Sequence, residues 1–187
     1  MIETYLNNRT AYHEAAHALV GRLLRCDVGV VTTLGNRAAS GHTFVEPPDS
    51  PDSDHVQLIV LAAGRAGEAF TPTDLPEVVP VENEITKRAQ AILSESEREE
   101  AIHERKSVWP EGWPYATCDQ ITFWSICVRL NMGDYSSFQS EWQRRVEQAR
   151  GLLANNEATF HCLAGELIRR QILFSKDIQE IVSGIQS

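Results

Sequence analysis

The sequence predicts one domain of the mainly α (α+β) class, with a small β-hairpin or sheet near its N-terminal end. Apolar residues recur at helical spacing over most of the 187 residues, and the one stretch rich in Val and Thr lies early, at 27–33. The composition, 42% hydrophobic and 23% charged, is that of a globular chain long enough to bury a core. We therefore treat residues 1–187 as a single domain.

The first predicted helix covers about residues 8–25, and Asn7 or Asn8 can cap its N-terminus. Helical spacing gives it one buried stripe, formed by Tyr12, Ala16, Leu19, Val20, Leu23 and Leu24. Two strands of a hairpin are expected next, at 27–33 and 41–45, with Gly35-Asn36 favouring the turn between them.

A second helix is predicted at 55–70, after a loop rich in proline and acidic residues. Because it is apolar on most sides, it should lie at the centre of the fold. A proline-rich loop, a charged helix at about 82–106 and an aromatic loop at 109–115 follow. The remaining predicted helices cover about 119–130, 137–153, 156–171 and 175–185, the last capped by Ser175, and no strand is expected among them.

Charge and composition exclude several classes of partner. The net charge of -9 repels nucleic acid phosphates and anionic lipid, so neither partner is expected. We also expect no membrane span and no signal peptide, since no apolar run has the roughly 18–20 residues of a span and the first ten residues lack a basic and an apolar region. The four cysteines form no CxxC pair, which predicts reduced thiols in a cytoplasmic protein.

His13-Glu14-Ala15-Ala16-His17 has the form HExxH and lies on the first predicted helix. Residues four apart share a helix face, so both imidazoles can bind one zinc ion at about 2.0–2.1 Å. Glu14 is placed to take a proton from a zinc-bound water, whose pKa zinc lowers to about 7. The motif predicts a zinc-dependent hydrolase, with His13 and His17 as ligands and Glu14 as general base. Two surface histidines would be the alternative, but this helix is apolar.

The ten residues from Ala11 to Val20, AYHEAAHALV, closely resemble the zinc helix of the FtsH family of ATP-dependent metalloproteases, whose pattern is YHEAGHALV. Gly41-His42-Thr43 is similar to the G-x-T strand of that family, on its substrate-binding side. Residues 63–68, AGRAGE, resemble its GGRAAE helix, and the stretch at about 137–185 resembles its closing helices. The likeness covers most of the chain, with an insertion near 75–115. It implies a helical zinc-metallopeptidase domain that cleaves peptides or unfolded protein segments.

The resemblance also implies an Asp as third zinc ligand, on a later helix within a pattern like GASND. Two positions compete for this role. Asp119, in Ala-Thr-Cys-Asp, matches in residue type, and its helix leads into the closing helices. Glu84, in 80–85, matches better in its spacing after Arg65 but offers Glu instead of Asp. Either carboxylate can bind zinc, and we favour Asp119.

Other polar residues are expected to have structural roles. His42 should be a half-buried strand residue, and Arg65 and Glu68 should form structural hydrogen bonds rather than take part in catalysis. We expect no ligand role for three further histidines, His55, His103 and His161. Cys118 is expected to be a small buried thiol. The loop at 109–115 could line a peptide cleft or pack over the core.

No GxxxxGK[ST] phosphate loop occurs in the chain, and only twelve residues precede His13. We therefore expect a peptidase module that cannot unfold substrates with ATP by itself. It would act alone or with a separate ATPase subunit, and a homo-oligomer is open, because the family forms rings. The hypothesis from a different class is a non-catalytic descendant that serves as a binding or regulatory module.

Overall fold

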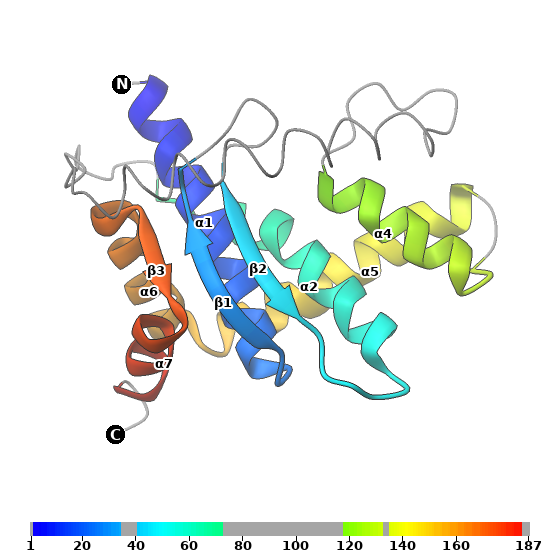
Figure 1. The fold of residues 1–187 in the computed structure, drawn as a ribbon. Helices are drawn as coiled ribbons and strands as arrows, with labels where there is room; N and C mark the ends of the chain where they lie inside the picture. Colours follow the sequence, from blue (N-terminus) through cyan, green and yellow to red (C-terminus); the bar gives the residue numbers. More distant parts are fainter. Residues whose placement is uncertain (1, 35–40, 73–117, 133–134, 185–187) are drawn as a thin grey trace.

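The computed structural model describes residues 2–34, 41–72, 118–132 and 135–184. These residues form a mainly helical fold with a small antiparallel sheet, as the sequence predicts (Figure 1). The elements in chain order are α1 (Ile2–Leu23), β1 (Asp27–Thr32), β2 (His42–Glu46), α2 (Ser53–Glu68), α4 (Cys118–Arg129), α5 (Tyr135–Ala154), α6 (Glu157–Arg170), β3 (Ile172–Phe174) and α7 (Ser175–Gly184).

The sheet has the order β2-β1-β3, with both pairs antiparallel. The predicted hairpin strands pair in the register that places Val28 opposite Val45 and Thr32 opposite His42. The predicted turn at Gly35-Asn36 lies outside the described residues. The expectation that all strands lie early was wrong, because β3 pairs with the other edge of β1. Three residues are too few to show the alternation that reveals a strand in a sequence.

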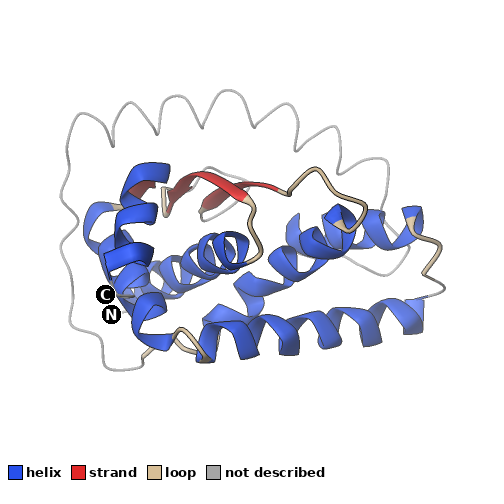
Figure 2. Cartoon of the chain, turned by 90° about the horizontal axis from the view of Figure 1, so that it is seen from below, coloured by secondary structure: helices blue, strands red, loops and turns tan. Residues whose placement is uncertain are grey.

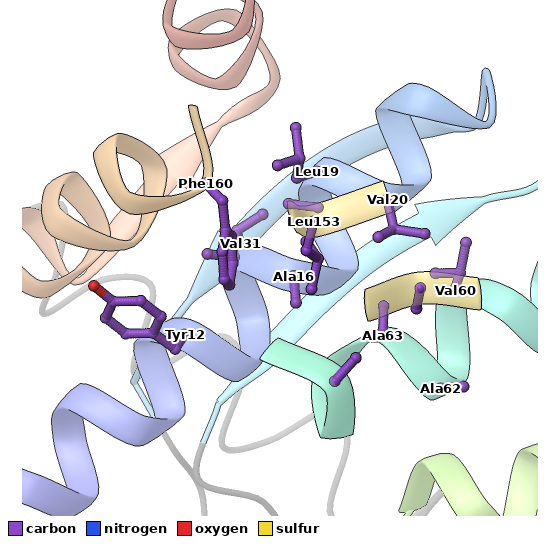
Figure 3. Close-up of a cluster of buried hydrophobic side chains, with 14 of the residues drawn as sticks. Tyr12, Ala16, Leu19, Val20, Val31, Val60, Ala62, Ala63, Leu153 and Phe160 are labelled. Atoms are coloured by element: carbon purple, nitrogen blue, oxygen red, sulfur yellow. The ribbon is translucent and has the colours of Figure 1, made fainter. Parts of the chain in front are cut away.

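α1 lies against one face of the sheet, and Figures 1 and 2 show the strands along one side of the helical layer. Of its predicted stripe, four members are buried in the core and two are partly buried. The buried side chains of this stripe belong to one hydrophobic cluster with Phe160 and Leu153 (Figure 3). The prediction of an Asn7 or Asn8 cap was wrong, since α1 begins at Ile2 and Asn8 is buried inside it.

α2 is central, as its apolar sequence predicts, and it packs against α1, α4 and α5. Its contact with α1 is close because small residues face each other across it. A Cβ built on Gly67 would lie 2.5 Å from Ala16 Cβ and 2.6 Å from Tyr12 O, nearer than side chains can approach. This close packing sets how α2 crosses the HExxH segment.

The later helices, α4 to α7, follow their predicted positions within one or two residues. At the start of α7, the Asp177 carboxylate accepts a hydrogen bond from the backbone N–H of Phe174 at 2.9 Å. The predicted insertion at 75–115, with the charged helix and the aromatic loop, lies outside the described residues. Within the described ranges no helix has the length and hydropathy that crossing a membrane requires.

Candidate metal centre

The structure brings His13, His17 and Asp119 together. The two histidines lie one turn apart on α1, with ring centroids 4.8 Å apart, and Asp119 lies in the first turn of α4. Asp119 Oδ2 is 3.0 Å from His13 Nε2 and 3.4 Å from His17 Nε2. One donor atom from each side chain lies within 4.8 Å of the other two, so the group could hold a metal ion.

Two of the three separations between these atoms fit a small divalent cation. In a tetrahedral zinc site with bonds of about 2.0–2.1 Å, neighbouring ligand atoms are about 3.3 Å apart. The two nitrogen–oxygen separations, 3.0 and 3.4 Å, lie on either side of that value. Two imidazoles and one carboxylate are common zinc ligands, and three protein ligands leave a fourth position for water.

The other nitrogen of each ring faces an oxygen. His17 Nδ1 is 2.7 Å from the backbone oxygen of Val60, and His13 Nδ1 is 3.0 Å from Glu68 Oε1. A carbonyl and an ionised carboxylate can only accept, so each Nδ1 carries a proton and donates. The nitrogen that faces Asp119 is therefore Nε2 in both rings, which is how metal-binding histidines are usually held.

Gly64 of α2 allows this approach of the two rings. A Cβ built on Gly64 would lie 2.3 Å from His13 Nε2 and 2.5 Å from His17 Nε2, so any larger residue would collide with both nitrogens. The backbone of α2 thus covers one side of the group. Since glycine has no side chain, it is the residue that permits such close contact.

Glu14 is held by the strand segment that the sequence resemblance singles out. Its side chain is buried, and the Thr43 hydroxyl donates to Glu14 Oε2 at 2.7 Å. A Cβ on Gly41 would lie 2.8 Å from Glu14 Cγ and Oε1. Burial raises the pKa of Glu14, although His17, His13 and the Thr43 hydrogen bond each lower it. A carboxyl group with a raised pKa suits proton transfer near neutral pH.

The charges of the group depend on one another. Burial lowers the pKa of His13, but the hydrogen bonds to Asp119 and Glu68 outweigh this effect and raise the pKa to about 10. Burial also opposes the charge of His17, whose pKa Asp119 nevertheless raises. The pKa of Asp119 is lowered despite its burial, because both rings favour its ionised form. Without a metal, a proton on His13 Nε2 thus fills the place next to Asp119.

The remaining predicted residues lie elsewhere. His42 is a half-buried residue of β2, as expected. His55 Nδ1 is 3.1 Å from Arg145 Nη2, and His161 Nδ1 is 2.8 Å from the Tyr12 hydroxyl. The described thiols, Cys26, Cys127 and Cys162, are free. Two further residues lie outside the described ranges: His103, and Glu84, which was the other candidate for the third ligand.

No family model matches this chain, and a search of curated proteins finds no significantly similar sequence. The likeness to the FtsH family therefore depends on the motif residues themselves. Three of the stretches that carry it are far apart in the sequence, and the structure places these three at one site: the HExxH turn, Gly41 with Thr43 next to Glu14, and Gly64 next to both histidines with Glu68 next to His13.

Two contacts at this site were not predicted. The Val60 carbonyl that accepts from His17 has no sequence signal, because every residue has such a group. Glu68 was expected to form only structural hydrogen bonds, yet it contacts His13. Its position gives a signal that could have identified it: Glu68 follows Gly64 by four residues, so both lie on the helix face toward α1.

Proposed function

We propose that this chain is a zinc-dependent endopeptidase that hydrolyses peptide bonds in peptides or unfolded protein segments. The observation that supports this best is the convergence of two imidazole Nε2 atoms and one carboxylate oxygen beside a buried glutamate. His13, His17 and Asp119 would hold the ion. The donor set also suits other divalent cations, and zinc is proposed because it takes two histidines, a carboxylate and a water in hydrolases.

Bound zinc would polarise the scissile carbonyl and make its water acidic. Glu14 would take a proton from a water in the open position while the oxygen of that water attacks the carbonyl carbon. When the C–N bond breaks, Glu14 would pass this proton to the leaving nitrogen, so the products are an amine and a carboxylic acid that ionises at neutral pH. The Thr43 hydroxyl on Glu14 Oε2 keeps the carboxylate in one orientation during both transfers.

β2 is the strand on which we propose that an extended substrate lies. Within the part of the chain that the structure describes, its one strand partner is β1. Thr43, the second residue of β2, contacts Glu14, so a peptide paired with this strand would pass near the general base. Substrates of extended conformation commonly bind by adding a strand to a sheet edge. A separate ATPase subunit that supplies unfolded segments belongs to the same proposal, as do a cytoplasmic location and a homo-oligomer.

Metal analysis and a hydrolysis assay test the proposal together. The purified full chain is expected to hold about one zinc per chain and to cleave fluorescently labelled casein, with loss of cleavage on chelation and recovery on addition of zinc. Glu14→Gln should keep the zinc and lose the cleavage, because an amide cannot take the proton from water. Glu147→Gln is the matched control, since Glu147 is exposed on α5 and pairs with Arg150.

Full activity of Glu14→Gln would rule out the mechanism. Zinc binding without any cleavage of casein or unfolded peptides would favour the non-catalytic binding or regulatory module. Absence of both zinc and cleavage would leave the cluster as an ion pair between the two rings and Asp119, and the proposal would be wrong.

A further inference from the structure

Glu68 lies at the C-terminal end of α2 and has two different sets of partners on its two oxygens. Oε1 accepts from His13 Nδ1 at 3.0 Å. Oε2 accepts from the guanidinium of Arg9 and, at 2.7 Å, from that of Arg65. One carboxylate thus joins a candidate metal ligand to two cations.

The two arginines reach Glu68 from different helices. Arg9 lies on α1 one turn before His13, and Arg65 lies on α2 one turn before Glu68. The arginine side chains are 42% and 61% exposed, whereas that of Glu68 is only 17% exposed. The carboxylate is therefore fixed from both sides at the boundary of the core, while the cations remain in contact with solvent.

This arrangement differs from an ordinary surface ion pair because the arginines contact only one oxygen of the carboxylate. Both cations use Oε2, so Oε1 is available for the ring of His13. The arginines also offset the negative charge of Glu68. A charge-balanced carboxylate can orient an imidazole without itself competing strongly for a nearby divalent cation, since metal ligation by carboxylate depends on available negative charge.

We propose that Glu68 is a positioning residue of the metal centre: clamped by Arg9 and Arg65, it fixes the ring of His13 so that Nε2 points at His17 and Asp119. This inference rests on the metal site of the proposed function, not on the hydrolysis. Residues that orient a metal-binding histidine in this way typically change metal affinity by about 10–100-fold when they are replaced.

Zinc affinity of the full chain tests the inference directly, without reference to catalysis. The measurement is a competition between the metal-free protein and a chromophoric chelator for zinc alone. Glu68→Gln should weaken zinc binding by about 10–100-fold. Glu166→Gln is the matched control, because Glu166 forms the same i, i+3 pair with an arginine, at 2.6 Å, on the outer face of α6. Its zinc affinity should equal that of the unmodified protein.

A melting curve of each metal-free variant separates positioning from simple stabilisation. Loss of zinc affinity in Glu68→Gln beyond any effect of Glu166→Gln supports the inference. Unchanged zinc affinity with a lower melting temperature would overturn it and leave Glu68 as a structural ion-pair residue. If Glu68→Gln does not fold, Arg65→Gln decides, since it loosens Oε2 from one side: weakened zinc binding supports the clamp and unchanged binding overturns it. Failure of the unmodified chain to bind zinc would instead refute the metal site itself.

Discussion

Replacing Gly64 by Ala should abolish metal binding while leaving the fold intact. The added Cβ would lie 2.3 Å from His13 Nε2 and 2.5 Å from His17 Nε2, whereas ordinary van der Waals contact begins at 3.4 Å. The rings must therefore move by about 1 Å, and metal–ligand distances tolerate deviations of only about 0.2 Å. We expect zinc affinity to fall by at least about 100-fold, which corresponds to roughly 2.7 kcal/mol.

The fold should survive this change because the atoms in the way are the ends of two side chains, which can rotate. Gly67→Ala, one turn along the same helix, is the informative contrast. There the Cβ meets the backbone oxygen of Tyr12 and the Cβ of Ala16, so α1 and α2 would have to separate. Gly67→Ala is therefore expected to lower the free energy of unfolding, whereas Gly64→Ala mainly removes the metal.

Gly165→Ala controls for helix propensity. No atom lies within 4 Å of a Cβ built on this exposed glycine of α6, so the variant should gain about 0.5–1 kcal/mol of stability and bind zinc normally. The measurements are chelator competition for zinc and chemical denaturation of each metal-free variant. Tight zinc binding by Gly64→Ala would refute the reasoning, since no site using both Nε2 atoms in this geometry could accommodate the methyl group.

Two further predictions concern protons. The pKa of His13 is raised to about 10 in the metal-free protein, so zinc must displace the proton of this ring at neutral pH. The apparent zinc affinity should therefore rise about tenfold per pH unit for each proton displaced. Only above about pH 10 should the contribution of His13 to this pH dependence disappear. Isothermal titration in buffers of different ionisation enthalpy counts these protons, and an affinity that is independent of pH would contradict the prediction. Thr43→Val should keep the zinc but slow hydrolysis roughly tenfold or more, since a hydrogen bond to a charged group contributes about 1.5–3 kcal/mol. Because that bond lowers the pKa of Glu14, its loss should also move the acidic limb of the pH–rate profile to higher pH, and an unmoved limb would contradict this prediction.

The local part of the site could be predicted from the sequence because it depends on one helix. The four-residue spacing of His13 and His17 fixes their common face, and the apolar residues around them fix which face is buried. The helix start was less predictable: asparagine favours caps, but tertiary packing buried Asn8 inside α1. β3 was missed for a related reason, since its three residues form a strand only because the edge of β1 is next to them.

The third candidate metal ligand was harder to predict, because it is close to the histidines in space but far from them in the sequence. Asp119 is 106 residues from His13, and residue type and spacing favoured different candidates. The structure places the Asp119 carboxylate beside both rings, a contact that depends on how α2 packs against both α1 and α4. Residues 63–68 of α2 resemble a family helix in sequence, but their contacts with the histidines were not predicted. Gly64 and Glu68 nevertheless make contacts that define the site.

The charges around the site support the proposed metal centre. The buried Glu14 and Asp119, whose side chain is 23% exposed, bring two carboxyl groups to the site, and Glu68 brings a third that Arg9 and Arg65 offset. In the metal-free protein the pKa of His13, raised to about 10, lets this ring supply compensating positive charge as a proton, and Asp119 raises the pKa of His17 as well. A divalent cation bound at Nε2 would provide the same compensation and leave the rings neutral. A carboxyl group held by Thr43 near the rings, and a glycine whose backbone lies close to both Nε2 atoms, serve the proposed metal centre, whereas an ion pair between the rings and Asp119 needs neither.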